Sequence, residues 1–217
     1  AADTAKLFQR HRKRKQRELR SKLLSIMFFR MPLFDPEHLL RKLKPLIHII
    51  FSPVGAAVWL AVVALAVKVV VDRFDLAVDQ FQGVLAPDNL ILLYAGLVVI
   101  KSLHEFGHSF MCKRFGGEVH TMGVMLLVFT PLPYMDATSS WAFRSRWKRS
   151  LVAGAGMITE IFVAAVAAFV WARTGPGTIH SLAYNIMFIA SVSTVLFNGN
   201  PLLRFDGYSI LSDLLDI

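Results

Sequence analysis

The sequence predicts an all-α polytopic membrane protein with about four transmembrane helices. Two observations support this class. The 217 residues are 55% hydrophobic and 18% charged, with a mean hydropathy of +0.51, whereas a soluble domain is usually about 45–50% apolar and about 25% charged. The apolar residues also collect in segments of about 20 residues, the length that crosses about 30 Å of hydrocarbon.

The net charge of +9 is distributed around these apolar segments. Basic residues gather at 10–17, before the first segment, at 113–114, after the second, and at 144–149, before the third. The cytoplasmic ends of transmembrane helices carry such an excess of Lys and Arg. We therefore expect a cytoplasmic N-terminus, the lipid bilayer as a partner and no nucleic acid.

Residues 1–46 are expected to form a basic, amphipathic lead-in that is cytoplasmic or interfacial. A short helix is predicted over Asp35–Lys44, because Asp35 suits the N-cap, Pro36 suits the first helical position and Pro45 ends the helix. Leucines on one side and basic residues elsewhere predict that this helix lies at the membrane surface.

Residues 47–89 are expected to form the first transmembrane helix and an outer loop. The helix is predicted at about Ile47–Val71. The loop that follows, 72–89, carries four Asp and one Arg. Because it is acidic, the positive-inside rule places this loop on the outer side.

Residues 90–217 are expected to form the functional core. The remaining spans are predicted at about Leu90–Phe115, Lys148–Trp171 and Ile179–Leu203. The apolar stretch 122–135 is too short to span and is interrupted by Pro131 and Pro133. It is therefore predicted to be a re-entrant segment or short hairpin that is buried in protein.

The most informative motif is His104-Glu105-Phe106-Gly107-His108, inside the second predicted span. On a helix, His104 and His108 are four residues apart and project from the same face. Two imidazoles in this arrangement can bind one Zn²⁺, which leaves Glu105 to act on water at the metal. The motif predicts hydrolytic chemistry within a bilayer.

A catalytic zinc usually has three protein ligands, and the end of the fourth predicted span supplies a candidate third, Asp206. Pro201 is expected to break the helix there and Gly207 to permit an unusual turn, so that Asp206 can point back inward. His120 and Asp136, which flank the re-entrant segment, are alternative third ligands.

Two further charged residues lie inside the predicted spans. Glu160 either accepts a hydrogen bond from a ligand histidine, as metal sites commonly arrange, or is a packed carboxyl satisfied by its local surroundings. Lys101, three residues before His104, is expected to face water or a carboxylate.

The two motifs together resemble those of the site-2 protease (M50) family of intramembrane zinc metalloproteases. That family pairs H-E-x-x-H on one transmembrane helix with N-x-x-P-x-x-x-x-D-G on a later one. Asn198, Pro201, Asp206 and Gly207 fall at these spacings, and the resemblance covers about 90–217. The residues of the second motif are similar to those of a bacterial branch of peptide zinc metalloproteases.

The resemblance implies a role for each residue of the two motifs. His104, His108 and Asp206 would bind Zn²⁺, and Glu105 would be the general base toward water. Asn198 would steady the substrate or the developing oxyanion. The resemblance also implies a multi-pass protein of a bacterial cytoplasmic membrane. Because the motif half of the second span runs toward Lys113 and Arg114, the active site is expected toward the cytoplasm.

The function expected from these features is hydrolysis of peptide bonds in transmembrane or membrane-associated substrates, which would lie extended along the re-entrant segment. The alternative is a non-proteolytic zinc-binding subunit of an export or other membrane assembly, with partners from that assembly. A metal or proton transporter is a weaker alternative. Because the chain begins at Ala1 without Met and stops at Ile217 directly after a motif, it is expected to be part of a longer protein.

Overall fold

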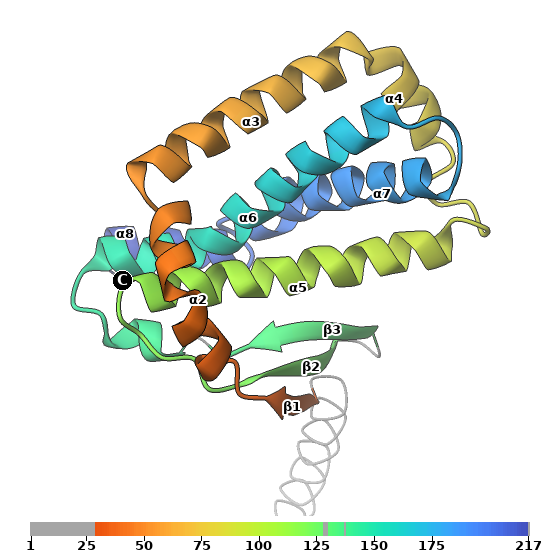
Figure 1. Cartoon of the computed structure of the whole chain (residues 1–217). Coiled ribbons are helices and arrows are strands. Elements are labelled where there is room, and N and C mark those ends of the chain that lie inside the picture. Colours follow the sequence, from red (N-terminus) through yellow and green to blue (C-terminus); the bar gives the residue numbers. More distant parts are fainter. Residues whose placement is uncertain (1–28, 128–129, 137, 217) are drawn as a thin grey trace, which may run out of the picture.

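The computed structural model describes residues 29–127, 130–136 and 138–216, and they are mostly helical. The basic run at 10–17 lies outside these residues. Four helices are long and apolar enough to cross a membrane, as the hydropathy of the sequence predicted. They are α3 (Pro53–Asp72), α5 (Leu90–Arg114), α6 (Arg146–Arg173) and α7 (Thr178–Val192), the last extended to Asn198 by a π-helical turn. Helix α6 lies between α3 on one side and α5 and α7 on the other (Figure 1).

Helix α2 (Glu37–Ile50) begins where the lead-in helix was expected but continues through Pro45. The prediction that Pro45 ends this helix is therefore wrong. Leu40 and Ile47, seven residues apart on one face, are both fully buried in the protein. Their burial offsets the hydrogen bond that a proline removes from a helix interior.

The first candidate span begins at Pro53 and not at Ile47, the expected start. Ser52 is its N-cap, and the Ser52 hydroxyl accepts a hydrogen bond from the N–H of Gly55 (3.1 Å). Pro53 occupies the first turn, where a missing N–H leaves no bond unmade. The acidic stretch that follows was expected to be a loop, but it contains α4 (Phe74–Phe81).

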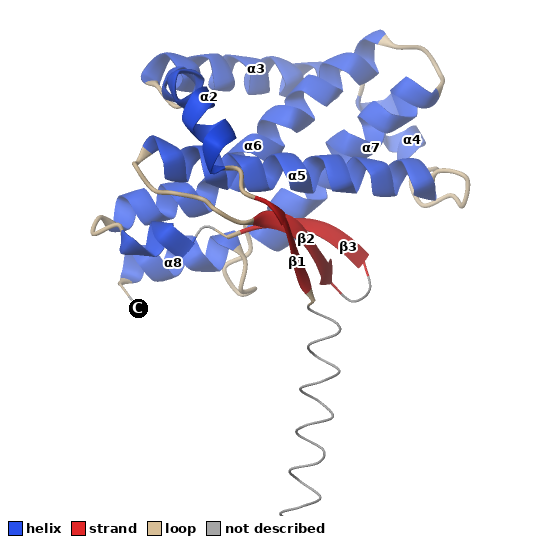
Figure 2. Cartoon of the chain, turned by 60° about the horizontal axis from the view of Figure 1, so that its bottom comes forward, coloured by secondary structure: helices blue, strands red, loops and turns tan. Residues whose placement is uncertain are grey.

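A three-stranded antiparallel sheet lies on one side of the bundle, next to α5 (Figure 2). The expected hairpin forms from β2 (Met122–Leu127) and β3 (Thr130–Met135). A strand from the lead-in, β1 (Arg30–Phe34), pairs with the other edge of β2. The all-α prediction is therefore incomplete, because β1 provides hydrogen-bond partners for the second edge of β2, which the hairpin alone leaves unpaired.

The prolines of β3 lie at positions whose backbone faces away from β2. The N–H of Asp136 donates to the carbonyl of Thr121 (3.0 Å). Because the direction of bonding alternates along a strand, the odd-numbered residues of β3 face its other edge. The carbonyl of Pro131 accepts a hydrogen bond from the Tyr94 hydroxyl of α5 (2.8 Å), as this alternation requires. Pro131 and Pro133 therefore cost the sheet no hydrogen bond.

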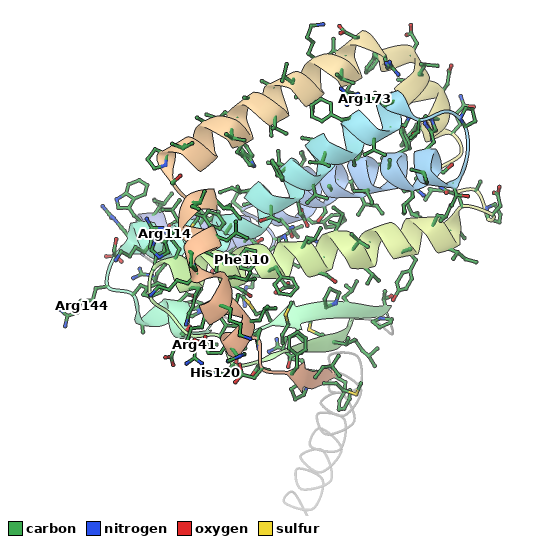
Figure 3. The ribbon with its side chains drawn as sticks, in the orientation of Figure 1. Arg41, Phe110, Arg114, His120, Arg144 and Arg173 are labelled. Carbon is green, nitrogen blue, oxygen red and sulfur yellow. The ribbon has the colours of Figure 1, made fainter. Side chains whose placement is uncertain are left out.

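Basic side chains gather at one end of the helix bundle (Figure 3). Arg41 of α2, Arg114 at the end of α5 and Arg144 before α6 lie at this end, whereas Arg173 lies at the opposite end. The half of α5 that carries the histidine motif is the half nearest the basic end.

Candidate metal centre

Helix α5 places His104 and His108 on one face, one turn apart, as the motif predicted. Both side chains are buried, with 5% and 8% of their surface exposed. Their Nε2 atoms lie 2.9 Å apart, and the rings meet edge to face. The Nε2 atoms of the two imidazoles therefore point to one place between α5 and α6.

Asp206 reaches the same point from the first residue of α8 (Asp206–Leu215). One carboxylate oxygen lies 3.1 Å from His104 Nε2, and the other lies 3.6 Å from His108 Nε2. The donor atoms of these three residues all lie within 4.8 Å of one another. The three ligands expected from the sequence are therefore brought together, although Asp206 lies 98 residues after His108 in the chain.

The backbone that brings Asp206 into the cluster differs from the expected one. The helix before it ends at Asn198, so the break precedes Pro201. Gly207 lies within α8 and has no left-handed φ. A Cβ at Gly207 would lie 2.8 Å from the carbonyl oxygens of Asn198 and Gly199. Gly207 is therefore required for close approach of α8 to the preceding turn, and not for an unusual turn.

Each imidazole is fixed by a bond at its other nitrogen. His108 Nδ1 lies 2.7 Å from the carbonyl of Val152, to which it donates. His104 Nδ1 lies 3.1 Å from Oε1 of Glu160. With Nδ1 protonated on both rings, both Nε2 atoms present lone pairs to the cluster, as metal ligands do.

The residues present fit a divalent cation. Asp206 Oδ2 is buried and makes no hydrogen bond of good geometry. Its carboxylate faces the unprotonated Nε2 atoms of both histidines at 3.1 and 3.6 Å, and a cation between these lone pairs would satisfy all three groups. A Cβ at Gly156 of α6 would lie 2.4–2.5 Å from atoms of both imidazoles, so the glycine leaves space beside the cluster. Two imidazoles and a carboxylate form a ligand set typical of zinc.

The cluster opens onto a cavity of about 1160 Å³ between β3 and the helices. Glu105 lines this cavity together with His104, His108 and Asp206. The side chain of Glu105 could therefore contact a water or substrate molecule in the cavity. Asn198 is also in the cavity wall, but its amide donates to Glu160 (3.2 Å) and approaches His104 Nδ1 at 3.5 Å. Its expected contact with substrate stays a prediction.

The alternative third ligands do not join the cluster of metal-ligating side chains found among the described residues. His120 is exposed and pairs with Asp35 (3.0 Å) and Glu118 (3.3 Å). Asp136 lies in the cavity wall, where its carboxylate accepts the N–H of Thr138 (3.0 Å).

Comparison of the chain with protein-family models, with curated proteins and with solved structures found no match.

Proposed function

We propose that this protein is an intramembrane zinc metalloprotease of the site-2 protease type. The observation that carries the proposal is the buried cluster of His104, His108 and Asp206, which lies beside Glu105 at the wall of a cavity inside apolar helices. Ionisable groups inside a membrane are rare and mark functional sites. This constellation combines metal-ligand chemistry with a carboxylate that is not a ligand, as hydrolytic zinc sites do.

The membrane setting of the proposal rests on the four candidate spans and on the charge distribution (Figure 3). The basic end of the bundle would face the cytoplasm by the positive-inside rule. The histidine motif lies in the half of α5 nearest that end. The proposed site is therefore within the bilayer on its cytoplasmic side, reached by water through the cavity. A bacterial membrane is proposed from the resemblance of the motifs alone.

Zinc supplies a Lewis acid for the scissile carbonyl and lowers the pKa of water at the site. The residues of the chain have separate tasks. His104, His108 and Asp206 hold the ion, and the hydrogen bonds at the histidine Nδ1 atoms orient the rings. Glu105 takes a proton from the attacking water on its carboxylate and returns it to the leaving amine. The surrounding apolar helices exclude bulk water, which strengthens each of these electrostatic contacts.

We propose that the substrate backbone lies extended along the outer edge of β3. The Pro131 carbonyl is already bonded to Tyr94. The alternation along β3 leaves the carbonyl of Pro133 and both the carbonyl and the N–H of Met135 for an added strand. This edge therefore accepts substrate N–H groups at two alternate positions and donates to one substrate carbonyl, at the end of β3 nearest Ser109 of the motif helix.

The test is metal analysis of the purified, detergent-solubilised protein by mass spectrometry, combined with cleavage of a transmembrane peptide in liposomes. We expect about one zinc per chain. Glu105→Gln should keep the zinc and lose cleavage, because only the base is removed. Asp206→Ala should lose most of the zinc. Zinc that is retained without cleavage by the wild-type chain would support the non-proteolytic subunit, and no zinc would refute both functions.

A further inference from the structure

Glu160 is the most completely buried charged side chain of the described residues, with 0% of its surface exposed. It lies in the middle of α6, in a segment apolar enough to cross a membrane. A carboxylate at such a position is unfavourable unless every oxygen is paired. Its partners therefore indicate why it is present.

Two of these partners come from one face of α5. Lys101 Nζ lies 2.8 Å from Glu160 Oε1, and His104 Nδ1 lies 3.1 Å from the same oxygen. Lys101 and His104 are three residues apart and so lie on the same side of the helix. The lysine supplies the charge that balances the carboxylate, while the histidine is a member of the metal cluster.

The other partners come from the π-helical turn that ends α7. Thr194 Oγ1 donates to Glu160 Oε2 (2.6 Å), Ser193 Oγ donates to Oε1 (3.1 Å), and the Asn198 amide donates to Oε2 (3.2 Å). The wide turn, marked by the bond from Gly199 N–H to the Thr194 carbonyl (2.7 Å), brings Asn198 within 3.3 Å of Ser193. Such π-turns are frequently found at functional sites.

We infer that Glu160 is a positioning residue of the metal centre. Its carboxylate holds the proton of His104 on Nδ1 and so directs Nε2 toward His108 and Asp206. Lys101 and the π-turn hold the carboxylate in place, so that α5, α6 and α7 all determine the orientation of one ligand. The inference rests on the proposed metal site and deepens it.

The hydrogen bonds behind the two histidines are unequal. His108 donates to a neutral carbonyl, that of Val152, whereas His104 donates to an ionised carboxylate. A carboxylate partner makes an imidazole a stronger base and a better ligand than a carbonyl does. Loss of the Glu160 charge should therefore weaken metal binding even when the shape of the side chain is kept.

The experiment measures Co²⁺ and Zn²⁺ affinity of the full chain in detergent by competition with a chromophoric chelator. Glu160→Gln should bind either metal about 10–100-fold more weakly than the wild type, with a changed Co²⁺ absorption spectrum. Because Gln leaves Lys101 without its counter-ion, the double variant Lys101→Met/Glu160→Gln serves where the single variant does not fold. It should show the same weakening.

A matched control is Asn185→Ala. Asn185 is also buried and makes an interhelical hydrogen bond, with Asn89 at the start of α5, the end of that helix away from the motif. Its loss should lower the melting temperature and leave metal affinity unchanged. Wild-type affinity and spectrum in Glu160→Gln would refute the positioning role while leaving the metal site intact. Absence of metal binding in the wild type would refute the metal site itself.

Discussion

The space beside the metal cluster can be tested by a single methyl group. Gly156 of α6 faces the two histidines, and a Cβ built there would lie 2.4 Å from His104 Cε1 and 2.5 Å from Nε2 of both His104 and His108. Gly156→Ala therefore places a methyl group at the point where the ring nitrogens converge. Because these contacts are shorter than 3.0 Å, the rings must move, and the movement is costly because both histidines are buried.

The size of the required movement follows from the contact distances. Ordinary van der Waals contact begins at 3.4 Å, so the distance from the added Cβ to each Nε2 is too short by 0.9 Å (3.4 minus 2.5 Å). Metal–ligand distances tolerate changes of only about 0.2 Å. Because both imidazoles are displaced by several times this tolerance, we expect metal affinity to fall by at least about 100-fold, the upper end of the effect of losing one supporting hydrogen bond.

The assay is the same chelator competition, with metal content measured by mass spectrometry. Gly154→Ala is the matched control, because it adds the same methyl group to the same helix. Its Cβ meets only Ile210 Cδ1, at 3.5 Å, an ordinary contact. Both variants gain about 1 kcal/mol of helix propensity, so a general effect of alanine would appear in both. Wild-type metal affinity in Gly156→Ala would show that the cluster is not a metal site of this geometry.

Two further predictions concern stability. Burial raises the pKa of the Glu37 carboxyl, but hydrogen bonds from Lys113 and a backbone N–H lower it by more, so the pKa lies below its usual value of 4.5. The stability contributed by this pair is complete above pH 4.5 and is lost as the pH falls through the folded-state pKa. In thermal melts, Glu37→Gln should therefore have a lower melting temperature than the wild type at pH 7, and its melting temperature should fall less when the solution is acidified. Melting temperatures that fall in parallel for the two proteins would contradict this. Gly107→Ala would place its Cβ 2.7 Å from a carbonyl of α6 and should cost about 1–3 kcal/mol in denaturant titrations, whereas Gly96→Ala, with contacts of 3.4 Å or more, should be tolerated.

Hydropathy located the helices of the core well because each is bounded by polar or helix-breaking residues. The predicted span Leu90–Phe115 differs from α5 by one residue at its C-terminal end. The predicted span Lys148–Trp171 differs from α6 by two residues at each end. The predicted end at Leu203 was wrong, because the fourth helix already ends at Asn198, ahead of Pro201. Asn198 is already committed to Glu160 there, five residues after Ser193.

Local signals were insufficient where a distant element decides the conformation. A proline such as Pro45 is expected to end a helix. Here α2 continues through it, because burial of Leu40 and Ile47 on one face stabilises the helix on both sides of the proline. Strand β1 has no alternating pattern, since all of its residues are exposed, and it forms because β2 offers an unpaired edge. The acidic stretch becomes α4 where Gln80 and Ala77 accept hydrogen bonds from Trp171 and Tyr184 of the core.

The site was predictable to a greater depth than the fold around it, because metal binding depends on residue type more than on packing. His104 and His108 could be proposed from spacing and chemistry, Asp206 was the one of three candidate third ligands that the motif resemblance singled out, and the structure brings these three residues together. The role of Glu160 could not be decided, since a buried carboxylate is equally consistent with local packing. Its assignment required the position of Lys101 and the π-turn, neither of which a sequence pattern specifies.

The number of ligands distinguishes the two proposed functions. A zinc ion with a purely structural role is closed by four protein ligands, whereas a catalytic zinc has three and leaves a position open. Among the residues that the structure describes, the group around His104 contains three side chains of the metal-binding types. Its open side is the cavity that Glu105 lines, and not the packed interior of the bundle. The proposed protease would use both the open position and the Glu105 carboxylate, neither of which a purely structural zinc site needs.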